Sequence, residues 1–284
     1  MLKRISIILG VSLTFFVLAV VAVLYHQGKQ KPDTGGQYVA LGSSFAAGLG
    51  LGSRQPGSPF ICMRSTHGYP HLLARSLGLS LVDMTCSGST TAHILHGGQV
   101  FLGPQMAAVG AKTRLVTITS GGNDVGYIAD LMFESGSIGP IGKALSPKNP
   151  PADQRDYAAI TRNLTQIGFE IRKRAPNALI AIVSYPPVLP ATGTCATLQV
   201  APGRVEESRI VARRLAEATR RAALQTGAVF VDMATIGLGH DACADRPWVN
   251  GAGDDNGAPF HPNQEGAAAT ANAIAKALST SLKS

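Results

Sequence analysis

The chain has 284 residues, of which 45% are hydrophobic and 15% charged, and its formal net charge at pH 7 is +8. Nothing pairs this positive charge with the aromatic side chains on which nucleic-acid bases stack, so the composition argues against a nucleic-acid-binding protein. The chain is long enough to bury a substantial hydrophobic core.

The N-terminal segment is strongly apolar. Its residues 5–25 include no charged side chain, and as a helix they would span about 31 Å, close to the hydrocarbon thickness of a membrane. No small-x-small cleavage site precedes Gln27, so we favour an uncleaved transmembrane anchor over a removable signal peptide for residues 1–26. In either case we expect the rest of the chain to be exported, either anchored on the extracytoplasmic side or secreted after cleavage.

Residues 27–36 are polar and contain Lys, Gly and Pro, which predicts a tether, and residues 37–284 fit a single domain. The chain has four cysteines and no Cys-x-x-Cys pair. An even number of cysteines in an exported chain indicates disulfides, and four cysteines allow three pairings. We favour Cys62–Cys86 together with Cys195–Cys243.

Short strands alternate with helical stretches along this domain. We expect strands at 38–41, 79–85, 115–119, 178–184 and 229–233, and helices at 69–77, 157–174, 205–225 and 265–282. The alternation predicts a three-layer α/β/α fold with a mostly parallel five-stranded sheet covered on both faces. The segment 130–152 is rich in Gly, Pro and Ser, and we expect an irregular lid or binding loop there.

Part of the positive charge falls on one predicted helix. Residues 204–221 include six arginines and three glutamates. We interpret this stretch as a solvated helix face, and attraction to an anionic membrane or envelope surface is the alternative.

Four short stretches hold the candidate chemistry. Three follow predicted strands, namely GSSF at 42–45, CSGS at 86–89 and SGGND at 120–124, and the fourth, PFHPN at 259–263, precedes the last helix. Because sites in parallel sheets form at the carboxyl ends of strands, we expect these stretches to meet. They contain a serine, a histidine and hydrogen-bond donors, which are the groups that acyl transfer requires.

In this order the stretches resemble the motif blocks of the SGNH hydrolase superfamily, also called GDSL lipases and esterases. They are most similar to the actinobacterial secreted esterases that contain disulfides. The resemblance covers residues 38 to about 267 and implies a flavodoxin-like fold and carboxylic ester hydrolysis without cofactor or metal. It implies Ser44 as nucleophile, His261 as base, and an oxyanion hole formed by the Ser44 amide, the Gly88 amide and the Asn123 side chain.

Each residue also has a plainer interpretation. Ser44 could cap a helix, Gly88 could serve a turn that needs positive φ, and Asn123 could cap its loop. We expect Asp124 to hold the loop through backbone N–H groups. Ser43 is the rival nucleophile; it replaces the aspartate of the family pattern, and we expect it to face away from the pocket and to organise the turn by a local hydrogen bond.

A second departure concerns the base. Ala258 replaces the aspartate of the family's Asp-x-x-His block and has no carboxylate to orient His261. We expect the backbone carbonyl of Ala258 to accept a hydrogen bond from Nδ1 of His261, which would leave Nε2 facing Ser44. Asp254 or Asp255 is the alternative partner.

Two further arrangements involve histidine. His93 and His96 are three residues apart, but no third ligand is nearby in the sequence, so we expect no metal site. His240 and Asp241 form a weaker alternative dyad.

We therefore predict a monomeric, exported serine esterase or lipase with a Ser-His dyad, which acts on acyl lipids or small acyl esters. It would contact the membrane through its N-terminal segment and would bind no nucleic acid. The alternative is a catalytically weak or inactive module of the same fold that binds acylated envelope glycans or lipids.

Overall fold

The computed structural model describes residues 2–145, 148–253 and 257–281, except for the side chains of residues 2–11, 13, 141, 145 and 281. Within these residues, parallel strands form one sheet with the order β2-β1-β3-β4-β5. The strands are β1 (Tyr38–Gly42), β2 (Leu81–Asp83), β3 (Leu115–Thr119), β4 (Leu179–Val183) and β5 (Val229–Val231). The predicted five-stranded parallel sheet is confirmed.

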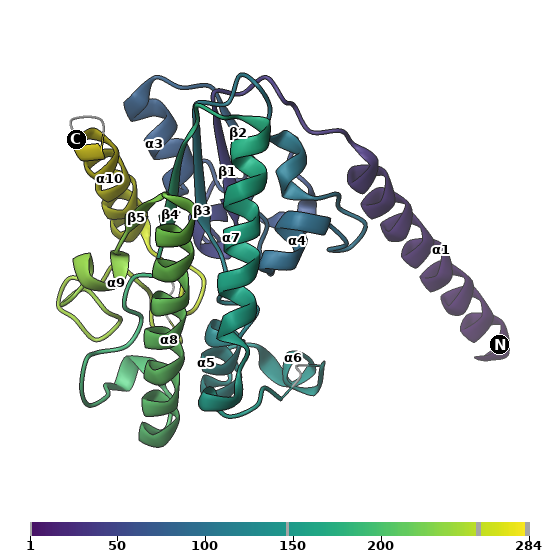
Figure 1. Cartoon of the computed structure of the whole chain (residues 1–284). Helices are drawn as coiled ribbons and strands as arrows, with labels where there is room; N and C mark the ends of the chain where they lie inside the picture. The colour runs from purple at the N-terminus through teal and green to yellow at the C-terminus, as the bar shows by residue number, and fades with distance from the viewer. Residues whose placement is uncertain (1, 146–147, 254–256, 282–284) are drawn as a thin grey trace.

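Helices cover both faces of the sheet (Figure 1). One face packs against α3 (Tyr69–Leu77) and α10 (Gln264–Ser281), and the other against α4 (Thr91–His96), α7 (Tyr157–Arg174) and α8 (Pro202–Thr226). The shorter elements are α2 (Ser44–Ala47), α5 (Tyr127–Ser135), α6 (Gly139–Leu145), α9 (Met233–Ile236) and the 3₁₀ turns η1 (Phe60–Cys62), η2 (Gln105–Ala108), η3 (Ala152–Gln154) and η4 (Ala196–Leu198). This is the three-layer α/β/α architecture expected from the sequence.

Strand β1 shows why the sheet is covered on both sides. Val39 and Leu41 belong to the core beneath α7 and α8, whereas Tyr38 and Ala40 belong to the core beneath α3 and α10. Because successive side chains of a strand point to opposite faces, a strand that is buried on both faces must be apolar throughout.

The segment 130–152 contains helices, and its interpretation as an irregular loop is wrong in this respect. Most of α5 and all of α6 fall within it. Leu131 is fully buried and Ile128, just before the segment, is nearly so, and both belong to the core beneath α8. Their apolar side chains therefore pack inward.

Helix α1 (Leu2–Lys29) projects away from the α/β body, to which a short extended stretch connects it (Figure 1). It ends three residues later than the predicted boundary at residue 26. Among the residues that the structure describes, no helix is long and apolar enough to cross a membrane. This finding gives no support to the predicted anchor, although the side chains of residues 2–11 and 13 lie outside the described part.

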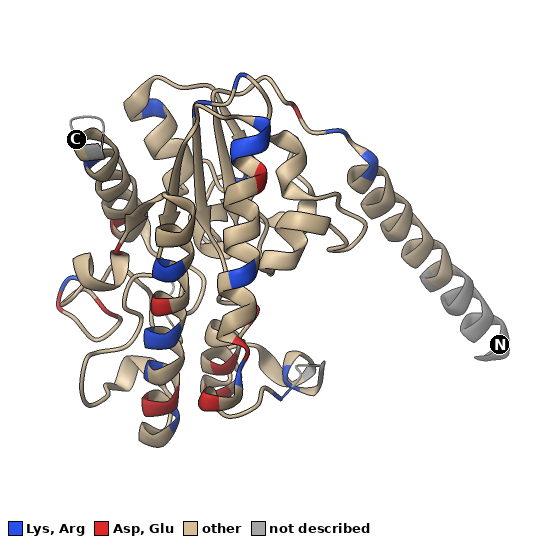
Figure 2. Ribbon diagram, viewed as in Figure 1, with Lys and Arg blue, Asp and Glu red and all other residues tan. Residues whose placement is uncertain are grey.

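Basic and acidic residues are mixed along α8 (Figure 2). The ion pairs join Arg204 to Glu134 and Glu207, Arg209 to Glu206, Arg220 to Asp232 and Arg221 to Glu217. Pairing with neighbouring carboxylates is consistent with a solvated helix face, the interpretation that we favoured.

Both favoured disulfides are present. Cys62 is bonded to Cys86, and Cys195 to Cys243. The first disulfide joins η1 to the loop that follows β2, next to Gly88, so it restrains a stretch expected to contribute to the site.

Candidate active site

Ser44 and His261 are 217 positions apart in sequence, and their side chains are in direct contact. Nε2 of His261 lies 2.7 Å from Oγ of Ser44, and both residues are buried. Ser44 is the first residue of α2 and is separated from the carboxyl end of β1 by Ser43 alone, while His261 lies in the loop before α10. The fold thus brings together a hydroxyl and an imidazole in the geometry of a nucleophile and its general base.

The turn between β1 and α2 depends on Gly42. Its φ is +146°, and a Cβ at this position would lie 2.3 Å from the carbonyl oxygen of Thr119 on the neighbouring strand. The side chain of Gln105 forms hydrogen bonds with both backbone polar groups of Gly42. Oε1 accepts from the Gly42 N–H at 2.8 Å, and Nε2 donates to the Gly42 carbonyl at 3.0 Å. Nε2 also donates to Oγ of Ser89 at 2.9 Å, so Gln105 connects the first stretch (GSSF, 42–45) to the second (CSGS, 86–89).

Ser43 makes a long-range contact in place of the expected local hydrogen bond. Its Oγ lies 3.1 Å from the hydroxyl of Tyr185, which accepts a hydrogen bond from the Gly122 N–H at 3.1 Å. The phenol is fully enclosed, and this burial raises the pKa of Tyr185 to about 12. Tyr185 therefore connects the first stretch to the third, a role that sequence reasoning missed although the residue follows β4 closely.

The orienting partner of His261 is a different carbonyl from the expected one. Nδ1 lies 2.7 Å from the carbonyl oxygen of Pro259. The Ala258 carbonyl instead accepts hydrogen bonds from the His261 N–H at 3.2 Å and from Nδ2 of Asn250 at 3.1 Å. The first of these closes a turn with Phe260 at φ +57° and proline at its second position, as in a type II turn.

This turn corrects the expectation for Ala258. Because the Ala258 carbonyl accepts a hydrogen bond from the backbone N–H of His261, the next carbonyl along the chain, that of Pro259, lies within hydrogen-bond distance of Nδ1. The alternative partners, Asp254 and Asp255, lie outside the described residues.

The environment of His261 favours a neutral ring. Burial lowers its pKa to about 4, and the hydrogen bond to Pro259 offsets the shift only in part. A neutral ring that donates from Nδ1 to the Pro259 carbonyl leaves the lone pair of Nε2 directed at Ser44. This is the protonation state that a general base requires.

A hydrogen bond links the loops that carry Gly88 and Asn123. Nδ2 of Asn123 donates to the Ser89 carbonyl at 2.9 Å, a bond that takes one of the two N–H donors of the amide. Gly88 has φ +79°, and its loop is fixed by hydrogen bonds from the Cys86 N–H to the Gly42 carbonyl and from Gln99 to the Ser87 carbonyl. The second stretch is therefore held against both the first and the third.

Asp124 has the structural surroundings that we expected. Its carboxylate accepts from the Thr91 N–H at 3.0 Å and from the Thr91 hydroxyl, to which Nδ2 of Asn163 also donates. Burial raises the pKa of Asp124. The residue thus fastens the third stretch to α4 and α7.

Comparison with known proteins assigns the chain to a family. The model of the GDSL-like lipase/acylhydrolase family matches residues 40–269. The chain belongs to this family. As a member of it, the protein is a carboxylic ester hydrolase with the SGNH hydrolase fold, as the sequence predicted.

Individual relatives agree with this family. The chain is 37% identical to Lipase 2 of Streptomyces coelicolor over 72% of both chains. It is similar to the crystal structure of an extracellular lipase from Streptomyces rimosus, with a TM-score of 0.69 and 29% identity over 84% of this chain and 98% of that one. Phospholipase A1 from Streptomyces albidoflavus gives a TM-score of 0.66 and 26% identity over 87% and 99% of the two chains.

The other histidine arrangements have different roles in this acylhydrolase. Nδ1 of His93 accepts a hydrogen bond from the Thr90 N–H and caps α4. His240 bonds to the Arg246 carbonyl and stacks on Trp248, so it does not pair with its neighbouring aspartate. Among the residues searched, no group of three or more His, Cys, Asp or Glu side chains could hold a metal ion.

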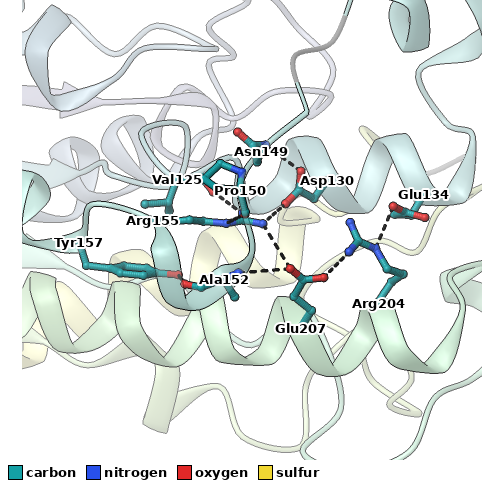
Figure 3. A network of polar contacts seen from close by, with 10 residues as sticks. All are labelled: Val125, Asp130, Glu134, Asn149, Pro150, Ala152, Arg155, Tyr157, Arg204 and Glu207. Atoms are coloured by element: carbon teal, nitrogen blue, oxygen red, sulfur yellow. Dashed lines mark hydrogen bonds and ion pairs between the residues drawn. The ribbon is translucent and has the colours of Figure 1, made fainter.

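A buried arginine holds α5 beside α8 (Figure 3). The guanidinium of Arg155 is 2.7 Å from the carboxylate of Asp130 on α5 and 4.0 Å from that of Glu207 on α8. It also donates to the carbonyls of Val125 and Pro150. Because Val125 directly follows the third stretch, this network positions that stretch relative to α8; sequence reasoning missed it.

Proposed function

We propose that the protein is an exported serine esterase or lipase that hydrolyses carboxylic esters of acyl lipids or small acyl esters through a dyad of Ser44 and His261. The single observation that carries the proposal is the 2.7 Å contact between Oγ of Ser44 and Nε2 of His261. Family membership and this contact both favour an active enzyme over the alternative of an inactive binding module.

The proposed reaction begins on the neutral dyad. Oγ of Ser44 attacks the ester carbonyl carbon while Nε2 of His261 accepts the hydroxyl proton, and the Pro259 carbonyl holds the Nδ1–H. The tetrahedral intermediate collapses when His261 gives this proton to the leaving alcohol, which produces an acyl-serine. Water then attacks the acyl-serine with the same proton transfers, releases the acid and restores Ser44.

Three donors are proposed for the oxyanion: the Ser44 amide, the Gly88 amide and the side chain of Asn123. Ser44 is the first residue of α2, where backbone N–H groups have no partner within the helix. The positive φ of Gly88 and the hydrogen bond of Asn123 to the Ser89 carbonyl fix the backbone of the other two stretches. Pre-positioned donors of this kind stabilise the charge that develops in the transition state.

Acyl lipids and export are supported by the relatives and the disulfides. Three of the relatives in Streptomyces are named lipases and one an esterase, and the similar structures are those of an extracellular lipase and a phospholipase A1. Two disulfides are typical of a domain that folds in an oxidising compartment. We propose that residues 37–284 form the catalytic domain, preceded by an N-terminal segment at 1–26 and a tether at 27–36.

Two variants of adjacent serines test the dyad. Ser44→Ala should abolish labelling by a fluorophosphonate probe and hydrolysis of a short-chain nitrophenyl ester, whereas Ser43→Ala should retain both. A panel of acyl esters of several lengths, phospholipids and acetylated sugars, with Ser44→Ala as the blank, identifies the substrate class. Undiminished hydrolysis by Ser44→Ala would overturn the assignment.

A further inference from the structure

Two loops beside the second stretch expose large apolar side chains. Phe60 and Met63 are 65% and 47% exposed at η1, and Val100 and Phe101 are 45% and 52% exposed in the loop between α4 and η2. The exposure of four large apolar side chains to water is unfavourable. Their clustering in two neighbouring loops therefore indicates a site that binds an apolar partner.

The backbone of these loops is also held in an unusual conformation. Met63, Val100 and Phe101 have φ values of +49°, +44° and +68°. Residues other than glycine rarely adopt a positive φ, and a β-branched residue such as valine is an outlier there. Such strain persists where the surrounding structure over-determines it, which often occurs at functional surfaces. Here the strained residues are the ones that present apolar side chains to solvent.

The end of α1 connects the two loops. The Tyr25 ring meets the Phe101 ring edge-on, with 5.8 Å between centroids, and Oε1 of Gln27 accepts a hydrogen bond from the Phe60 N–H at 3.0 Å. Tyr25 is itself exposed, and the exposed apolar side chains of residues 15–23 continue along α1. We call Tyr25, Phe60, Met63, Val100 and Phe101 the apolar rim.

Basic residues flank the apolar rim. Nζ of Lys29 lies 5.2 Å from the centroid of the Tyr25 ring, and the Arg54 guanidinium lies 5.0 Å from that of Phe60. Lys31 lines a cavity of about 370 Å³ between the tether and these loops. Aromatic rings combined with Lys and Arg match the headgroup region of a membrane whose surface is negatively charged.

We propose that the apolar rim docks the enzyme on an anionic lipid bilayer, with Tyr25 and the loop side chains among the acyl chains and Lys29, Lys31 and Arg54 on the headgroups. The same loops support the proposed oxyanion site. Gln99, next to Val100, donates to the Ser87 carbonyl at 2.7 Å, and the disulfide of η1 reaches the same loop. Docking would therefore place the bilayer next to the active-site loop, and it does not depend on the Ser44 chemistry.

Insertion of the rim can be measured directly in the full-length chain. Phe101→Trp places a fluorophore in the rim, and Phe169→Trp places one at a 50% exposed position on α7. With vesicles of phosphatidylglycerol and brominated phosphatidylcholine, the fluorophore of the Phe101→Trp protein should be quenched while that of the Phe169→Trp protein should not, after subtraction of the native Trp248 signal. Equal quenching of the two variants, or no quenching in the rim variant, would overturn the proposal.

A vesicle-binding titration tests the contribution to affinity. The double change Phe60→Ser and Phe101→Ser should weaken binding to phosphatidylglycerol vesicles about tenfold, whereas Phe169→Ser should not. Hydrolysis of a water-soluble short-chain ester should be the same in the unchanged protein and in both variants, which separates docking from catalysis. Unchanged vesicle affinity in the double variant would exclude a bilayer as the partner, and a protein would then be the partner to seek.

Discussion

Nδ1 of His261 lies 2.7 Å from the backbone carbonyl of Pro259, two residues earlier in the chain. A peptide carbonyl can fix the tautomer of the ring as a carboxylate does, because both accept the Nδ1–H. It has no negative charge, however, so it stabilises the protonated ring less than a carboxylate would. The pKa of His261 is lowered to about 4, with burial as the main cause.

This lowered pKa predicts the acid limit of activity. The neutral ring is the active form, so kcat/KM for a soluble ester should be constant down to about pH 5 and should fall as the pH passes through about 4. A histidine with an ordinary pKa would place this limit near pH ~6.5. The pH–rate profile measures it, and an acid limb at the ordinary histidine value would contradict the environment that we describe.

Acid should also weaken the fold through the same residue. In the unfolded chain His261 binds a proton near pH ~6.5, but in the folded chain its pKa is about 4. Its contribution to stability is therefore complete above about 6.5 and is lost progressively as the pH falls towards about 4. Urea unfolding at several pH values, run in parallel with the rate profile, separates loss of catalysis from loss of folded protein.

Removal of the Tyr185 hydroxyl should impair catalysis as well as stability. Tyr185→Phe leaves the buried Gly122 N–H and the Ser43 hydroxyl without this partner, which should cost about 1–3 kcal/mol in the free energy of unfolding. Because these groups hold the first and third stretches, kcat should fall as well. Tyr127→Phe is the matched control, since the hydroxyl of that buried tyrosine bonds to the Val188 backbone, which belongs to neither stretch. An equal loss of kcat in both variants would argue against the positioning role of Tyr185.

Gln105 should be equally important for the turn that presents Ser44. Gln105→Met keeps the length of the side chain but removes the partner of the buried Gly42 N–H and one of the two donors to the Gly42 carbonyl, which keeps the Cys86 N–H. We expect a loss of about 1–3 kcal/mol in unfolding free energy and a lower kcat with little change in KM. Chemical denaturation and steady-state kinetics measure the two effects. Wild-type kcat in a folded Gln105→Met protein would show that the turn is set by Gly42 alone.

The Arg155 network should make a large contribution to stability. Arg155→Met removes the positive charge that pairs with the partly buried carboxylate of Asp130, and it removes the donors to two backbone carbonyls. The loss should lower the free energy of unfolding by about 3–5 kcal/mol. Arg162→Met removes an exposed ion pair with Asp156 and should cost less than about 1 kcal/mol. Thermal and urea unfolding measure the loss of unfolding free energy in each variant. Similar losses in the two variants would contradict the prediction that the buried network contributes more than the exposed ion pair.

The sequence by itself predicted the architecture and the residues that approach one another. Alternating apolar strands and amphipathic helices are repeated local patterns, and their burial follows from side-chain polarity alone. The four stretches in order identified the family, because each follows or precedes an element whose position in the sheet is fixed by the fold. The two disulfide pairings were also predicted correctly.

Only the tertiary structure determined how the site is held together. Which carbonyl reaches His261 depends on the dihedral angles of its turn, and the side chain of Ala258 gives no information about them. Tyr185 and Gln105 contact the first stretch from 142 and 63 positions away, respectively, and no local pattern marks such partners. Residue identity therefore indicated the chemistry, while the orientation of each group came from backbone geometry and packing between segments far apart in the chain.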